Sequence, residues 1–296
     1  MSDDIDESDI EASRAPLLEH LIELRTRLII CVAALFLGFI VCFAFSEQIY
    51  LFLLMPFEKA GALVAAQNAG GSHGSFDLFL TLIGVKEAPS LDAKTLELIY
   101  TGPLEFFFTR LKLAAFGAVI LMFPILAWQL YRFVAPGLYR RERKAFLPFL
   151  LASPVLFLAG AALVYFVLLP FVMWFSLSQQ IVTENVTVEL LPKVSDYLTL
   201  VTTLLLAFGL CFQLPVVLTL CGLAGLVSSQ MLRTGRRYAI VGVFVVAAIV
   251  TPPDPISQLM LAIPICLLDE VSIWCVWLME RRRRKDEPEA KDAFVV

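Results

Sequence analysis

The sequence predicts an all-α integral membrane protein with six transmembrane helices, and three observations lead to this fold class. Hydrophobic residues make up 59% of the chain and the mean hydropathy is +0.82, which exceeds the apolar share of ordinary soluble domains. The long uncharged stretches mostly match or exceed the ~20 residues that a helix needs to cross a bilayer. When six spans are drawn, most basic residues gather on one side, as in membrane proteins of fixed orientation.

The first two spans follow directly from charge spacing. Residues 28–46 and 113–131 are two uncharged stretches of 19 residues each, and each predicts one spanning helix. Between them, residues 57–110 are expected to form an external loop that contains short helices, with a flexible Gly/Ala-rich piece at 61–75. The acidic N-terminus, residues 1–15, is expected to be disordered.

The third and fourth spans lie in longer uncharged stretches. Residues 145–183 hold 39 uncharged positions and residues 197–232 hold 36, more than one helix requires. The third helix is expected near 146–170, followed by a short external loop, and the fourth is expected to end near residue 220.

The last two spans are short. Only 16 uncharged residues, 238–253, follow a loop that carries Arg233, Arg236 and Arg237. At 1.5 Å per residue they cover about 24 Å, less than the ~30 Å hydrocarbon core. The sixth helix is expected at 257–279. It completes a membrane domain over 16–280, and a charged tail follows at 281–296.

Basic residues set the orientation. Seventeen of the 23 lysines and arginines fall on the side of the N-terminus, the turn 132–144, the turn 233–237 and the tail. Because basic loops stay in the cytoplasm, both termini are expected there.

Composition argues against an enzyme. None of the common hydrolase or nucleotide-binding motifs is present. The six cysteines lie singly in apolar runs, and His20 and His73 are the only histidines. We therefore expect no metal site, no cofactor and no catalytic residue.

Two acids close to basic residues are candidate binding groups. Glu23 precedes Arg27 by four positions, the favourable order for a helix pair, although a membrane-surface helix whose arginines touch lipid phosphates would show the same pattern. Glu142 is the one acid in the basic turn 132–144, which also fits a solvated surface charge. A carboxylate can bind a guanidinium through two parallel hydrogen bonds, a geometry that lysine does not offer.

Three segments resemble the TatC family, the multispanning subunits of the Sec-independent twin-arginine protein translocase. They are H-L-I-E-L-R-T-R-L at 20–28, F-V-A-P-G-L-Y-R-R-E-R-K at 133–144 and F-V-V-A-A-I-V-T-P-P-D-P-I-S-Q at 244–258. The similarity covers about residues 16–280, and three motifs in the family's order are more specific than any one of them.

The resemblance implies a concave, glove-like bundle in the bacterial cytoplasmic (inner) membrane. It implies a receptor that binds the twin-arginine signal peptides of folded proteins at the cytoplasmic face. It also implies export driven by the proton-motive force, in an oligomeric complex with the single-span partners TatA and TatB and without nucleic acid. The implied signal-peptide residues are Glu142, Glu23, Phe133, Arg25, Arg27, Leu28, Pro136 and Tyr139. The implied structural or partner-docking residues are Pro56, Pro124, Gln213, Asp254 and Gln258.

The sequence does not assign one function to three polar residues inside the spans. Gln213 stands where many family members carry glutamate, so it can form an interhelical hydrogen bond or dock a partner helix but cannot hold a charge. Asp269 and Glu270 lie within the sixth helix, where acids are candidates for function. Glu270 could pair with a neighbouring helix or face a water-filled concavity. The alternative function is a secondary transporter of a small solute, with these three residues lining its site.

Overall fold

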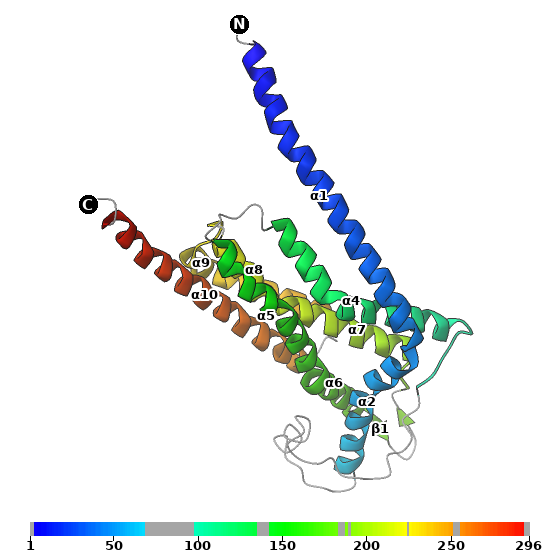
Figure 1. The fold of residues 1–296 in the computed structure, drawn as a ribbon. Coiled ribbons are helices and arrows are strands. Elements are labelled where there is room, and N and C mark those ends of the chain that lie inside the picture. The colour runs from blue at the N-terminus through cyan, green and yellow to red at the C-terminus, as the bar shows by residue number, and fades with distance from the viewer. Residues whose placement is uncertain are drawn as a thin grey trace.

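The computed structural model describes the backbone of residues 3–68, 98–134, 142–182, 187–188, 191–223, 225–250 and 255–292. Side chains are described for residues 21–64, 98–133, 151–180, 191–222, 225–249, 255 and 258–281. Long helices dominate (Figure 1), and the one strand pair within this part of the chain joins β1 (Ile181–Val182) to β2 (Thr187–Val188) in antiparallel register. The fold is therefore all-α. In order, the helices are α1 (Asp3–Ala44), α2 (Ser46–Asn68), α4 (Glu105–Val134), α5 (Glu142–Leu163), the π-helix η2 (Val164–Leu168), α6 (Leu169–Ser178), α7 (Val194–Cys211), α8 (Leu214–Leu223), α9 (Ser229–Val250) and α10 (Pro255–Asp292).

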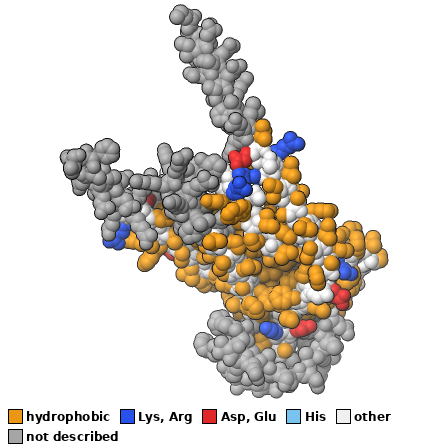
Figure 2. All heavy atoms as spheres, in the orientation of Figure 1, with side chains coloured by type: hydrophobic (Ala, Val, Ile, Leu, Met, Phe, Trp, Pro, Cys, Tyr) orange, Lys and Arg blue, Asp and Glu red, His pale blue; other side chains and the backbone are white. Residues whose placement is uncertain are grey.

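Among the described residues, five helical stretches are long and apolar enough to cross a membrane. They are Leu21–Ala44, Glu105–Phe133, Leu151–Ser178, Val194–Gly222 and Gln258–Arg281. Many of their large apolar side chains are exposed, and Figure 2 shows hydrophobic side chains across the middle of the visible face, with charged ones toward its ends. Such a surface is stable only in contact with lipid.

Helix α9 covers the predicted fifth span, and it differs from the prediction. The sequence places Arg233, Arg236 and Arg237 in a loop, but α9 begins earlier, at Ser229, and includes all three. The backbone N–H of Ser229 donates to Glu280 Oε1 at 2.8 Å, which satisfies one of the free N–H groups at a helix start. Only the part of α9 after Arg237 is apolar, so a full sixth crossing remains a prediction.

Two further segments are helical where the sequence predicts loop or disorder. Helix α1 starts at Asp3, within the segment 1–15 that is expected to be disordered. Acidic residues at a helix start interact favourably with the helix dipole. Helix α2 continues to Asn68, into the Gly/Ala-rich piece, because Ala60 and Leu63 are buried and alanine favours helix.

Helix boundaries elsewhere depend on proline. The third span runs unbroken through α5, η2 and α6, past the predicted end near residue 170. Pro170 lies just after the π-helical turn η2, so the hydrogen-bond spacing changes where the proline cannot donate. The fourth span is interrupted between α7 and α8 at Phe212 and Gln213. Pro215 explains the interruption, because it cannot donate to the carbonyl of Cys211.

Pro56 lies inside α2 and removes one backbone hydrogen bond from it. The carbonyl of Phe52, four residues earlier, loses its normal donor. The hydroxyl of Tyr165, on η2, donates to this carbonyl at 2.6 Å. The neighbouring carbonyl of Leu53 accepts from Tyr197 on α7 at 2.7 Å. The two tyrosines therefore fasten the proline turn of α2 to the core.

This arrangement gives a testable prediction. Tyr165→Phe should lower the free energy of unfolding by about 1–3 kcal/mol, because it leaves the Phe52 carbonyl without a donor. In a Pro56→Ala background the cost should shrink, since the substituted alanine restores a backbone N–H four residues after Phe52. Thermal melting of the four proteins of this double-mutant cycle in detergent measures the difference. Equal costs in both backgrounds would contradict the explanation.

The core is formed mainly by α2, α4, η2, α6 and α7, and α5 and α7 approach each other closely beside it. A Cβ atom on Gly209 would lie 2.5 Å from Cε2 of Phe157, and one on Gly160 would lie 2.8 Å from the carbonyl oxygen of Phe208. Phe157 is 1% exposed and stacks on Phe123 of α4 with 4.0 Å between ring centroids. Glycine at both positions therefore sets the spacing of α4, α5 and α7.

Candidate functional site

Helices α1 and α4 pack antiparallel in a fixed register. A Cβ on Gly38 would lie 2.8 Å from Cγ of Met122, and one on Gly117 would lie 2.9 Å from Sγ of Cys42. Because both helices rise about 1.5 Å per residue, this register brings Arg27 level with Phe133, near the end of α4. The first sequence motif and the start of the second therefore lie at the same end of the molecule.

Glu23 and Arg27 form an ion pair at this end. Both Nε and Nη2 of Arg27 donate to Oε1 of Glu23, with an Nε–Oε1 distance of 3.1 Å. The Arg27 side chain is 14% exposed and that of Glu23 is 34% exposed. The pair is thus partly shielded from water, and Glu23 already binds a guanidinium group.

The backbone of Glu142 lies at the same level as Glu23. Glu23 is four residues beyond Arg27 along α1, so it lies about 6 Å past the level of Phe133. The stacked rings of Phe123 on α4 and Phe157 on α5 place these two residues at one level. Toward the Glu23 end of the molecule, α4 continues for eleven more residues, to Val134. In the same direction α5 reaches fifteen residues, back to Glu142. Glu142 therefore also lies about 6 Å past the end of α4. Figure 1 shows this end of α4 and the start of α5 on the same side of the molecule.

The remaining residues predicted for signal-peptide binding fall in two groups. Arg25 and Leu28 are exposed, and the 3.6-residue period turns them away from the face of α1 that carries Glu23 and Arg27. Pro136 and Tyr139 lie outside the described residues, as does the side chain of Glu142. Among these residues, Glu23 and Arg27 are in direct contact, and Phe133 and the backbone of Glu142 lie at the same end of the molecule.

Gln213 forms an interhelical hydrogen-bonded pair, one of the two roles that the sequence leaves open. Its Nε2 donates to the carbonyl oxygen of Ser153 at 2.8 Å, and the Ser153 hydroxyl donates to its Oε1 at 2.7 Å. Both ends of the amide are therefore used in joining the α7–α8 break to α5. A neutral amide is suited to this double role, as it both donates and accepts.

The predicted structural prolines and the last turn occupy different places. Pro56 is buried in α2, whereas Pro124 lies exposed inside α4, which changes direction along its length (Figure 1). Gln258 Nε2 donates to the carbonyl oxygen of Phe244 at 3.1 Å, so it joins α10 to α9. Asp254 lies outside the described residues.

Comparison with known proteins decides the family. The family model for the Sec-independent protein translocase protein TatC matches residues 19–264. The chain belongs to the TatC family. The TatC of Magnetococcus marinus is 43% identical over 279 residues, covering 94% of this chain and 90% of that protein. The TatC of Rickettsia prowazekii is 38% identical, covering 86% of this chain and 90% of that protein.

A solved structure is similar to this chain in both sequence and fold. The crystal structure of a twin-arginine translocase receptor TatC has a TM-score of 0.66 and 32% sequence identity, and the match covers 88% of this chain and 98% of that one. The chain is thus a multi-pass membrane component of the Sec-independent protein translocase, and it is not an enzyme.

Nothing supports the alternative of a small-solute transporter. In this TatC protein, Glu270 pairs with Arg236 of α9, and Gln213 pairs with Ser153 of α5. The pairing of Glu270 with a neighbouring helix is one of the roles that the sequence leaves open.

Sequence reasoning missed several polar partners of this TatC fold. Tyr165, Tyr197, Ser153, Arg236 and Ser229 each bind a group distant in the sequence. A tyrosine or serine in an apolar run signals only that some partner exists, and the partner depends on helix register.

Proposed function

We propose that the end of the molecule formed by Glu23, Arg27, Phe133 and the start of α5 binds the twin-arginine signal peptides of folded proteins. The supporting observation is the common level of Glu23 and Glu142, which are 119 positions apart in the sequence. Two carboxylates at one level match a ligand with two adjacent guanidinium groups.

The chemistry of the Glu23–Arg27 pair supports this assignment. An arginine bound to a carboxylate is held through charge-assisted hydrogen bonds, and Arg27 binds Glu23 in this way. An arginine of the peptide would exchange with Arg27 at Oε1 of Glu23. Because one guanidinium replaces another, Glu23 never remains as an unpaired carboxylate.

Glu142 would receive the second arginine. It is the one acid among the basic residues Arg140, Arg141, Arg143 and Lys144 of this segment. Phe133, Pro136 and Tyr139 would shape the surface beside it. Arg25 and Leu28, on the outward face of α1, would instead contact lipid headgroups or the membrane interface.

Orientation and partners complete the proposal. The distribution of basic residues favours placing the Glu23 end in the cytoplasm of a bacterium, with both termini there. The chain would act in an oligomeric complex in the cytoplasmic membrane with single-span TatA- and TatB-type partners, and the proton-motive force would drive export.

Substitution of Glu23 tests the proposal at the described carboxylate. Glu23→Gln should weaken binding of a twin-arginine peptide about five- to tenfold, because a charge-assisted hydrogen bond becomes a neutral one. Fluorescence anisotropy with purified protein in detergent measures the affinity. Glu270→Gln removes the other described acid of an ion pair and serves as the control, with affinity expected to stay unchanged.

Export in cells tests the function as a whole. With this protein as the only copy, a folded reporter with an Arg-Arg signal should be exported, and the same reporter with Lys-Lys should not. Equal export of both reporters would contradict guanidinium recognition.

A further inference from the structure

Lys112 is a cation in the helix that carries the second membrane span, directly before the uncharged stretch 113–131. It lies seven residues after Glu105, in the apolar stretch Glu105–Phe133, and its side chain is exposed. At 1.5 Å per residue it is about 10 Å deeper than the start of α4. An ammonium group at such a depth is costly unless it reaches the interface or meets a polar partner.

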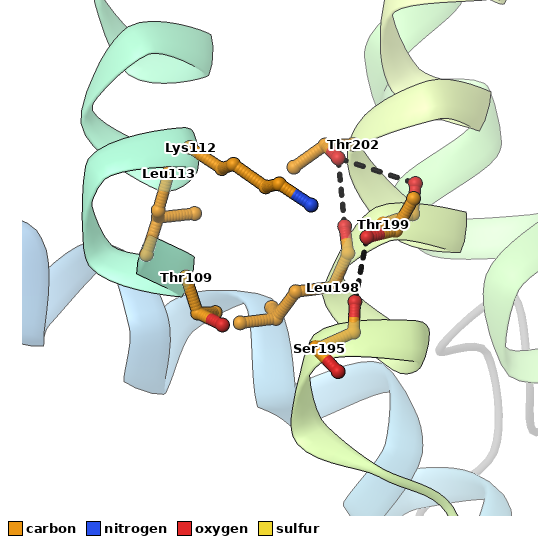
Figure 3. Close-up of a pocket in the computed structure, with 7 residues that line it drawn as sticks. All are labelled: Thr109, Lys112, Leu113, Ser195, Leu198, Thr199 and Thr202. Atoms are coloured by element: carbon orange, nitrogen blue, oxygen red, sulfur yellow. Dashed lines mark hydrogen bonds between the residues drawn. The ribbon is translucent and has the colours of Figure 1, made fainter. Parts of the chain in front are cut away.

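Hydroxyl groups of α7 face this lysine. Ser195, Thr199 and Thr202 recur with the spacing of one helix face, and Figure 3 shows the Lys112 ammonium pointing toward them. Thr199 Oγ1 donates to the Ser195 carbonyl at 2.6 Å, and Thr202 Oγ1 donates to the Leu198 carbonyl at 2.7 Å. Their oxygen lone pairs remain available, and a hydroxyl can turn to donate to a bound anion.

Two acids lie near these hydroxyl groups, and one of them, Glu105, already accepts a hydrogen bond from Ser195. Glu105 accepts from the N–H groups of Thr101 and Gly102 at 2.8 and 3.2 Å, and from the Ser195 hydroxyl at 2.5 Å. Asp196 is exposed in the first turn of α7. No ion pair involves Lys112 within the described part of the chain.

A cavity lies between Lys112 and the hydroxyl groups. Its volume is about 10 Å³, close to the space that a single water-sized oxygen needs. Above it, toward the start of α4, Phe106, Phe107 and Phe108 are 44%, 49% and 56% exposed. Aromatic side chains commonly mark the membrane interface, so acyl chains would lie against them.

We propose that Lys112 and the hydroxyl face of α7 bind the phosphate of a phospholipid. This lipid belongs to the leaflet on the far side from Glu23. One phosphate oxygen occupies the cavity and accepts from the Lys112 ammonium, so that the headgroup is held below the level of Glu105. The bilayer is thinned at this place, beside the interface of α4 and α7.

Counting bound lipid by native mass spectrometry tests the site. The full chain, purified in dodecyl maltoside, is incubated with dioleoylphosphatidylglycerol and washed. The wild type should retain one more phospholipid per chain than Lys112→Gln. Lys112→Arg, which keeps the charge, should behave like the wild type. The control Lys193→Gln, at an exposed lysine before α7, should also retain the extra lipid.

Two outcomes would overturn the proposal. Equal phospholipid counts for the wild type and Lys112→Gln would show that Lys112 does not bind a phospholipid. Equal retention of dioleoylglycerol, which lacks phosphate, or displacement of the lipid by inorganic phosphate, would show that the site does not select a lipid phosphate. Because no signal peptide is involved, the result is independent of the function proposed for Glu23 and Glu142.

Discussion

Replacing Glu142 with glutamine is expected to weaken the binding of a twin-arginine peptide about 100-fold, a loss of about 2.7 kcal/mol. The substitution keeps the size of the side chain and removes its charge. A guanidinium then loses its charge-assisted hydrogen bonds and faces the surrounding arginines and lysine without a compensating carboxylate. The effect of Glu23→Gln is expected to be smaller, because an arginine of the peptide has to displace Arg27 from Glu23. Fluorescence anisotropy in detergent measures both affinities.

The matched control for Glu142 is Glu47→Gln. Glu47 is an exposed acid in the first turn of α2, at the opposite end of α1 from Glu23, so its loss should leave the affinity unchanged. Glu142→Asp, which keeps the charge on a shorter side chain, should retain part of the binding. If Glu142→Gln and Glu47→Gln bind the peptide equally well, Glu142 does not contact the arginines.

Substitution of Gly209 is expected to have the largest effect on the fold. Gly209→Leu should lower the free energy of unfolding by about 3 kcal/mol, at the upper end of the usual cost of overpacking a core. The new Cβ would lie 2.5 Å from the ring of Phe157, and this ring cannot move aside because it stacks on Phe123. Thermal melting in detergent, followed by circular dichroism, measures the loss.

Gly242→Leu on α9 provides the comparison for this core substitution. No atom lies within 4 Å of a Cβ built on Gly242, so leucine meets open space there and gains the helix propensity that glycine lacks. Its melting temperature should equal or exceed that of the wild type. A similar fall in both variants would mean that α5 and α7 are not in close contact in the folded protein.

Local sequence patterns were sufficient for most of the membrane-spanning helices. Uncharged stretches of about 20 residues predict spans because burial in lipid dominates their energy. The same rule failed at α9, where Arg233, Arg236 and Arg237 were assigned to a loop. Arginine favours helix, and the Glu280 carboxylate of α10 accepts a hydrogen bond from the backbone N–H of Ser229 at the start of α9. Only a contact across 51 residues explains where that helix begins.

Charge pattern alone was not sufficient to predict the candidate site, because its ligand came from the resemblance to TatC and its geometry from helix packing. Charge pattern singled out Glu23 and Glu142 but left surface roles open for both, and only the resemblance to TatC gave them a ligand. Their common level follows from the registers of α1 with α4 and of α4 with α5. Gly38, Gly117 and the Phe123–Phe157 stack determine these registers. Such contacts cannot be read from a single sequence, because glycine and phenylalanine in apolar runs have many possible neighbours.

The most direct test of the account is a double-mutant cycle between Glu142 and the arginines of the peptide. Affinities are measured for the wild type and Glu142→Gln, each with an Arg-Arg peptide and with peptides in which one arginine is replaced by lysine. The account predicts that one lysine substitution costs much less in Glu142→Gln than in the wild type, with a coupling of about 1.5 kcal/mol or more. Effects of both lysine substitutions that simply add to that of Glu142→Gln, within about 0.5 kcal/mol, would contradict a carboxylate–guanidinium contact at this site.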